Sequence, residues 1–180
     1  VPLDSSIAHS LYAYLEEKQV PLIMHVNGAR YLDQLERVLD AHPDLVMVCP
    51  HFCLLTNMPG QLARLLDRYP NLSVDLSFGN FQSALSGFRI LSKDIEQWKR
   101  FVRVYVDRIT FGTDHVYSIH SSSERELATY NAYFGFVRDS TFTYNGSEFR
   151  GLAADACTLK HILEHNGERF VAGLPPERAP

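Results

Sequence analysis

Short, almost wholly apolar runs alternate along this chain with longer segments whose apolar residues recur at helical spacing. The apolar runs are "PLIMHV", "LVMVCP", "NLSVDLSF" and "RITFGT". Strands this uniformly apolar suit a sheet that is covered on both faces, and helices between them make parallel βα units with right-handed crossovers. The alternation therefore predicts an α/β fold built on a parallel sheet.

The helical segments begin and end at recognisable signals. Asp4 or Ser5 is a candidate N-cap for the first segment. Four apolar residues of this segment share one side: Ile7, Leu11, Tyr14 and Leu15. Further helices are predicted over "RYLDQLERVLDAHP", "GQLARLLDRYP" and "SKDIEQWKRFVRVYV", and Ser92 begins a capping-box-like sequence in the last of them.

The chain beyond the fourth apolar run is organised differently. After a long loop we expect a helix from about residue 122 to 138, and Asn145-Gly146 predicts a tight hairpin within "TFTYNGSEF". A last helix is expected from about residue 153 to 164. Residues 1–173 would then form one domain, and the polar, proline-rich residues 174–180 a flexible tail.

Composition narrows the class of protein. Of the 180 residues, 46% are hydrophobic and 21% charged, as in ordinary globular domains. The net charge of -4 comes without a basic stripe, so we expect a small-molecule partner and no nucleic acid. We recognise no membrane span and no signal peptide. Three cysteines are too few for a disulfide framework, so we expect Cys49 and Cys53 to be free, buried thiols of a cytoplasmic protein.

Polar side chains stand where the predicted strands end. His25 ends the first strand, His51 follows the second, Asp75 lies in the third and Asp114 follows the fourth. In parallel α/β folds the carboxyl ends of the strands share one rim, where ligands bind. Imidazole and carboxylate groups are ligands of zinc and similar divalent ions. The pattern therefore predicts a metal or substrate site at this rim.

The order and spacing of these segments resemble a known family. Five segments carry the resemblance: "PLIMHVNG", "VMVCPHF", "NLSVDLS", "RITFGTDH" and "FRGLAADACTLKHILEHNGERFV". Together, from about Pro21 to Val171, they look like the second half of an amidohydrolase-superfamily barrel. The branch they resemble most contains aminocarboxymuconate semialdehyde decarboxylase, resorcylate-type decarboxylases and dicarboxylate lactonases. The resemblance implies that the chain forms strands 5 to 8 of a (β/α)8 TIM barrel. It also implies a divalent metal cofactor, for which we expect zinc, with manganese or iron as alternatives.

Carried over residue by residue, the resemblance gives the strand-end residues their roles. His25 matches a metal ligand, and His51 matches a histidine that is either a ligand or a catalytic acid. Asp114 matches an aspartate that is both a ligand and the proton acceptor. We expect four neighbouring residues to contact the substrate: Asn27, Phe52, Asp75 and His115.

The chain departs from the family in what precedes its first strand. The family's first strand carries a His-x-His pair that supplies two metal ligands, whereas this chain has no His-x-His and only about four of the eight βα units. A half-barrel leaves two parallel edges unpaired. We therefore expect a partner that completes it, either the missing N-terminal half or a second copy of the chain.

These residues predict a metal-dependent hydrolase that attacks a small organic acid, ester, lactone or amide with metal-activated water. Two alternatives stay open: a non-oxidative decarboxylase of the same family, and a non-catalytic α/β interaction module or inactive fragment. "HILEH", residues 161–165, also matches the zinc pattern of inverted zincins, but that site needs an acidic ligand far downstream. We interpret this segment as part of the last outer helix.

Overall fold

The computed structural model describes residues 2–79, 81–114 and 122–177. Its main sheet has four parallel strands in the order β1-β2-β3-β4. In chain order they span Leu22–Ile23, Met47–Cys49, Leu72–Asp75 and Ile109–Thr110. Each strand pairs with the next one in the sequence, so that Met47 lies between Leu22 and Leu72. The predicted α/β class and parallel sheet are confirmed.

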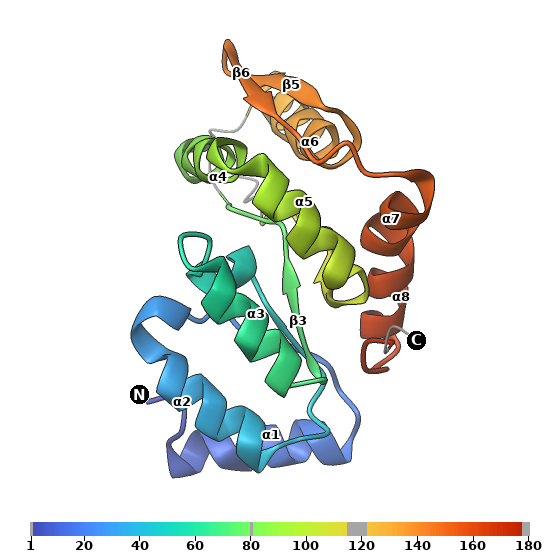
Figure 1. Ribbon diagram of the computed structural model, residues 1–180. Helices are drawn as coiled ribbons and strands as arrows, with labels where there is room; N and C mark the ends of the chain where they lie inside the picture. The colour runs from blue at the N-terminus through green and yellow to red at the C-terminus, as the bar shows by residue number, and fades with distance from the viewer. Residues whose placement is uncertain (1, 80, 115–121, 178–180) are drawn as a thin grey trace.

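Helices connect and cover these strands. In chain order they are α1 Ser6–Glu17, α2 Gly28–Ala41, α3 Pro59–Arg68, α4 Phe81–Lys93, α5 Ile95–Val104, α6 Ser123–Arg138, α7 Ala156–Lys160 and α8 Asn166–Val171. Short 3-10 turns occur at His51–Leu54 and Val106–Arg108, and a π-helical turn at His161–His165 joins α7 to α8. Figure 1 shows α2, α3, α5 and α8 following one another from left to right in chain order, with β3 visible between α3 and α5.

A smaller layer lies at one end of the molecule. It consists of α6 and an antiparallel hairpin, β5 Thr141–Tyr144 and β6 Ser147–Arg150, which has the predicted turn. At the top of Figure 1 this layer lies next to α4. The fully buried ring of Phe88, on α4, has its centroid 5.0 Å from that of Phe142 on β5 and 5.1 Å from that of Tyr133 on α6. This aromatic cluster joins the small layer to the rest of the core.

Helix α4 is the largest departure from the sequence expectations. We predicted no helix over Phe81–Lys93 and expected Ser92 to begin the next one. Ser92 instead lies inside α4, where its hydroxyl bonds both the backbone N–H and the C=O of Arg150. The helical conformation is interrupted at Asp94, which is the N-cap residue of α5. The Ser92 hydroxyl therefore links α4 to β6 and does not cap α5.

Helix α1 begins as predicted, with Ser5 as its N-cap, but its apolar side is only partly covered by the described chain. Ile7 is 80% exposed and Leu11 53% exposed, and the buried residue of the helix is Tyr12. On the neighbouring edge strand, Ile23 is 63% exposed. Of the four residues on the predicted apolar side, Leu15 is partly buried and packs against the cluster of Tyr12, Val38 and Leu45. Among the described residues the sheet ends at β1, next to the exposed part of this side.

The last described residues fold back on α8. Glu177 pairs with Arg169 at 3.1 Å and with His165 at 3.4 Å, so part of the expected flexible tail is held against the helix. His161, the other histidine of "HILEH", lies 2.7 Å from Asp107. The two histidines thus have separate carboxylate partners on the outer side of the fold.

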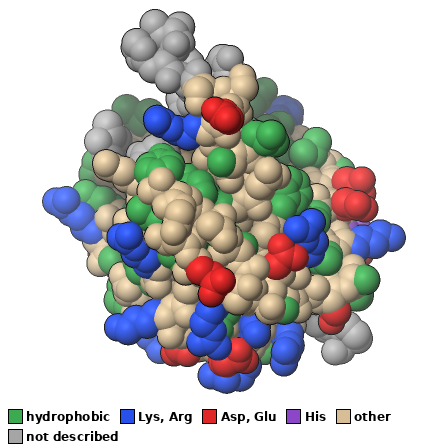
Figure 2. Space-filling model, turned by 90° about the horizontal axis from the view of Figure 1, so that it is seen from above, with side chains coloured by type: hydrophobic (Ala, Val, Ile, Leu, Met, Phe, Trp, Pro, Cys, Tyr) green, Lys and Arg blue, Asp and Glu red, His purple; other side chains and the backbone are tan. Residues whose placement is uncertain are grey.

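Charged side chains are dispersed over the face shown in Figure 2. Lys and Arg side chains lie among Asp and Glu side chains there, with hydrophobic side chains between them. The dispersion agrees with a sequence that has no basic stripe. Within the described ranges, no helix is long and apolar enough to cross a membrane.

Truncating Phe88 tests how strongly the small layer is joined to the core. Phe88→Ala leaves a cavity among the surrounding rings, so the free energy of unfolding should fall by about 3–5 kcal/mol. The matched control is Phe134→Ala on α6, which removes an exposed ring stacked on Phe111 and should cost about 1 kcal/mol. Urea-induced unfolding measures both, and equal losses would contradict the packing described.

Candidate functional site

The three predicted metal ligands meet at the carboxyl ends of the strands. His25 follows β1, His51 follows β2 and Asp114 follows β4, and all three line one cavity of about 580 Å³. Nε2 of His51 lies 3.5 Å from Oδ2 of Asp114. The ring centroids of His25 and His51 are 4.9 Å apart. The parallel sheet thus brings together side chains that are far apart in the sequence.

Another wall of this cavity comes from α4, the helix that sequence reasoning missed. It contributes five lining residues: Gln82, Ser83, Ser86, Gly87 and Ile90. Their amide and hydroxyl groups can donate and accept hydrogen bonds from a ligand. A signal for the helix was present in the sequence, because four apolar residues recur at helical spacing: Phe81, Ala84, Phe88 and Leu91.

His51 begins a left-handed turn. Its four residues, His51–Leu54, have φ values between 52° and 59°. This conformation costs a non-glycine residue on the order of 1–2 kcal/mol, so the surrounding structure must hold the turn in place. Strained backbone of this kind concentrates at functional sites. The turn directs His51 to the cavity and the next side chain, Phe52, into the core.

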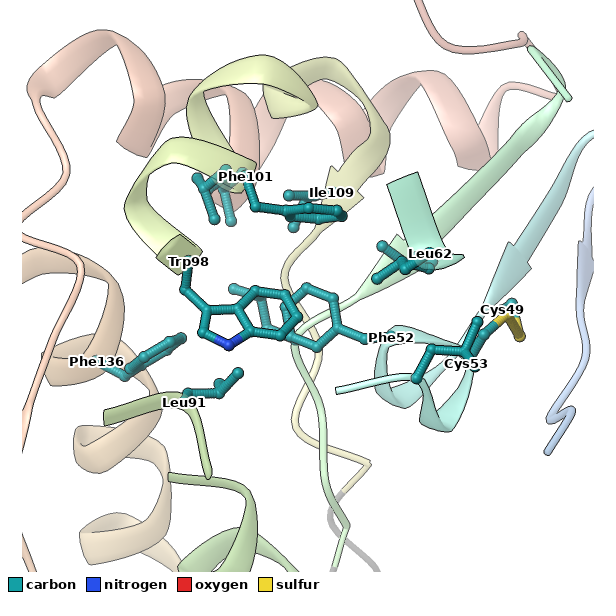
Figure 3. Close-up of a cluster of buried hydrophobic side chains, with 14 of the residues drawn as sticks. Cys49, Phe52, Cys53, Leu62, Leu91, Trp98, Phe101, Ile109 and Phe136 are labelled. Carbon is teal, nitrogen blue, oxygen red and sulfur yellow. A yellow bond between two sulfur atoms is a disulfide. The ribbon is translucent and has the colours of Figure 1, made fainter. Parts of the chain in front are cut away.

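Phe52 packs in the hydrophobic core and does not line the cavity. It is 1% exposed, and its ring centroid lies 4.9 Å from that of Trp98 and 6.3 Å from that of Phe101. Figure 3 shows the Phe52 ring against Trp98. The structure therefore gives Phe52 a packing role in the core, and a substrate contact of this residue is not supported by its position.

A disulfide joins Cys49, the last residue of β2, to Cys53 within the turn, at the right of Figure 3. The expectation that these two cysteines are free thiols is therefore wrong. The physical reason is the turn itself, which brings their Cα atoms within 5.2 Å of each other. Cys157 is free and exposed. The cysteines no longer support the expectation of a reducing compartment.

Asp75 contacts His51 and is not among the residues that line the cavity. Its Oδ1 accepts the backbone N–H groups of His51 and Ser77, each at 2.9 Å, and the Ser77 hydroxyl at 2.6 Å. Nδ1 of His51 in turn lies 2.9 Å from both the carbonyl oxygen and the hydroxyl oxygen of Ser77. Asp75 thus has three donors within the protein, and its contact with substrate stays a prediction.

Asp114 approaches the loop after β3 so closely that the loop needs a glycine. A Cβ atom on Gly79 would lie 2.9 Å from Oδ2 of Asp114, and Gly79 has a φ of 77°. The backbone N–H of Gly79 donates to the carbonyl of Thr113 at 3.2 Å. Asp114 itself has a φ of 48° and a half-exposed side chain. The absence of a side chain at Gly79 therefore leaves the space that the carboxylate of Asp114 occupies.

The same loop is anchored by a buried tyrosine. The hydroxyl of Tyr133 accepts the backbone N–H of Phe78 at 2.8 Å. Burial raises the pKa of Tyr133 well above its usual value, so the hydroxyl stays protonated. Phe78 lines the cavity beside Gly79 and is held there by this hydrogen bond.

His25 is exposed at the open edge of the sheet, where a second cavity of about 440 Å³ begins. Asn27 lines this second cavity, and its Oδ1 is buried without a hydrogen-bond partner among the described residues. An unpaired acceptor next to His25 is consistent with ligand binding, and the substrate contact of Asn27 stays a prediction. His115 lies outside the described residues.

Comparison with known proteins identifies the family. The sequence profile of the amidohydrolase family matches residues 2–172. The chain belongs to the amidohydrolase family. The crystal structure of an uncharacterized TIM-barrel protein from Bordetella bronchiseptica aligns with a TM-score of 0.60 at 21% identity, over 96% of this chain and 53% of that chain. This amidohydrolase chain thus spans about half the length of that barrel, as the sequence predicted. No curated protein sequence matches it.

Amidohydrolases generally use divalent metals, and the cavity residues fit part of such a site. Two zinc ligands at about 2.0–2.2 Å from the ion stand about 3.4 Å apart in tetrahedral geometry. The 3.5 Å between Nε2 of His51 and Oδ2 of Asp114 is close to this value. In the part of the chain that the structure describes, no group of three or more His, Cys, Asp or Glu is spaced to hold a metal ion. The pair therefore needs further ligands to bind an ion firmly, and the exposed ring of His25 has to turn toward the pair to become one of them.

Adding one methyl group at Gly79 tests the placement of Asp114. Gly79→Ala should displace the carboxylate and weaken zinc binding by about 10-fold or more, measured by competition with a chromophoric chelator. The matched control is Gly146→Ala, because Gly146 also has a positive φ, 69°, but no atom lies within 4 Å of its added Cβ. Both variants carry the same backbone cost, so equal zinc affinities in the two would contradict this placement.

Proposed function

We propose that this chain is the part of a metal-dependent hydrolase that binds the ion through His25, His51 and Asp114. One observation supports the proposal above the others. Three side chains with the right chemistry come from the ends of three strands and line a single cavity, in a chain whose family generally uses divalent metals. Barrel enzymes carry their catalytic groups at the carboxyl ends of the strands, where these residues lie.

The proposed roles follow from the chemistry of each group. A divalent ion, when bound, would supply Lewis acidity that makes a nearby water molecule easier to ionise. Asp114, half exposed at the cavity, accepts the proton of the attacking water. His25 and His51 hold the ion through ring nitrogens. The amide and hydroxyl groups of α4 bind the polar part of a small organic acid, ester, lactone or amide.

Substitution of the three residues separates this function from a packing role. In the full-length protein, His25→Ala and His51→Ala should lower zinc affinity about 10- to 100-fold. Asp114→Asn removes the proton acceptor and should lower turnover on a panel of lactones, esters and amides by about 10²- to 10⁴-fold. His165→Ala, on the outer side of the fold, is the matched control and should change neither quantity.

The outcomes of this experiment distinguish hydrolysis from the two alternative functions. Full zinc affinity and full turnover in all three variants would contradict the proposal. Release of CO₂ from small carboxylic acids, without hydrolysis, would assign the site to non-oxidative decarboxylation instead. A complete protein that binds no ion and turns over no substrate would favour a non-catalytic module.

We also propose that another βα half of the same barrel covers the open side of β1. The backbone N–H groups of Leu22 and Met24 donate to β2 and the residue before it. The N–H group of Ile23, between them, therefore points away from the sheet, as in any parallel edge strand. The exposed apolar side of α1 lies at the same edge. A second copy of this chain fits less well. If β1 of one copy paired with β4 of the other, α1 of the first and α8 of the second would both lie beside this pair of strands, where a barrel has one helix.

A substitution on α1 tests whether this side is covered. If another half packs on it, Leu11→Ala in the full-length protein should lower the free energy of unfolding by about 2 kcal/mol or more. If Leu11 is exposed, the same substitution should lower the free energy of unfolding by no more than about 0.5 kcal/mol. Val104→Ala, at an exposed position on α5, is the control. Equal, small losses in both variants would contradict the covering half.

A further inference from the structure

We propose that Asp75 and Ser77 are positioning residues that fix the tautomer and the direction of the His51 ring. The proposal rests on the proposed function, in which His51 binds a divalent ion through Nε2. Neither Asp75 nor Ser77 is among the residues that line the cavity, so each acts through His51.

The hydrogen bonds around Ser77 leave one assignment for the ring protons. The Ser77 hydroxyl donates its single proton to Oδ1 of Asp75, 2.6 Å away. The hydroxyl oxygen and the carbonyl oxygen of Ser77 are then both acceptors toward Nδ1 of His51, each at 2.9 Å. Nδ1 must therefore carry a proton. In the neutral ring, Nε2 carries the lone pair.

The same carboxylate oxygen also holds the backbone from which the ring projects. Oδ1 of Asp75 accepts the N–H of His51, the first residue of the left-handed turn, at 2.9 Å. It accepts the N–H of Ser77 at the same distance. One oxygen atom thus ties the start of the turn to β3 and, through Ser77, sets the rotation of the imidazole. Hydrogen-bonding partners behind a ligating histidine commonly have this function.

This arrangement prepares His51 to bind a cation. With Nδ1 protonated, Nε2 presents its lone pair toward Oδ2 of Asp114, 3.5 Å away. Two acceptors that face each other without a proton between them are satisfied by a positive ion. The hydrogen bonds of Asp75 and Ser77 therefore favour His51 as a ligand over His51 as a resting proton donor.

The test follows the ring nitrogens of His51 by NMR in the full-length protein, labelled with ¹⁵N-histidine and stripped of metal. At a pH of about 8, above the usual histidine pKa, wild-type His51 should show a protonated Nδ1 and an unprotonated Nε2. Its signals are identified by their loss in His51→Ala. Because no metal is present, this readout does not depend on activity or on the identity of the ion.

Two substitutions of Asp75 then separate the contribution of the carboxylate from general stability. Asp75→Leu frees the Ser77 hydroxyl proton to point at Nδ1, so an Nε2–H population should appear beside the Nδ1–H form that the Ser77 carbonyl still favours, and zinc affinity should fall about 10- to 100-fold. Asp75→Asn keeps a side-chain acceptor oxygen and should restore most of both. Ser73→Ala, at a buried β3 serine outside this network, is the matched control and should leave the tautomer unchanged.

An Nε2–H tautomer in the wild type would overturn the proposal, and so would a wild-type tautomer in Asp75→Leu. If the tautomer changes and zinc affinity does not, His51→Ala decides between the two claims. Loss of zinc in His51→Ala would overturn the positioning role, whereas retention of zinc would overturn the ligand role of His51 and leave the tautomer assignment intact. If Asp75→Leu does not fold, Ser77→Ala removes the hydroxyl link alone, and unchanged zinc affinity there would overturn the role of Ser77.

Discussion

Main-chain hydrogen bonding between parallel strands fixes where every other part of this site can be. Strands that run in one direction and pair in register, as Met47 does with Leu72 and Val74 with Ile109, deliver their last residues to a single rim. His25, His51 and Asp114 each follow such a strand, so the backbone alone brings them near one another. The loops beyond the strands only have to aim the side chains, and they do so with unusual backbone conformations.

The turn after β2 shows how that aiming is achieved. A left-handed run of four residues is unfavourable by itself, and three features hold it: the Cys49–Cys53 disulfide, the burial of Phe52 among aromatic rings, and the bond from the His51 N–H to Asp75. The strain is thus balanced by packing on one side and by hydrogen bonding on the other. The result is a histidine whose position and proton are both determined before any ligand arrives.

The strands and most helices could be predicted because uniformly apolar runs and helical spacing are local signals. The common rim of His25, His51 and Asp114 followed from the same signals, since parallel pairing brings strand ends together, whereas their roles as ligands came from the family resemblance and stay a prediction. What the sequence could not supply was geometry that depends on contacts. The left-handed turn goes with the burial of Phe52 in the core and with the pairing of Cys49 and Cys53, and neither effect has a local sequence signature. The apolar side of α1 also has a local signal, but Ile7 and Leu11 on that side are exposed in the described structure.

The central claim is that His51 and Asp114, with His25 beside them, hold one divalent ion. The most direct measurement is a crystal structure of the zinc-bound, full-length protein with an anomalous difference map recorded at the zinc absorption edge. We expect a single peak at about 2.0–2.2 Å from both Nε2 of His51 and Oδ2 of Asp114. Zinc-bound crystals with no peak between these two atoms, or with the peak held by other residues, would contradict the claim.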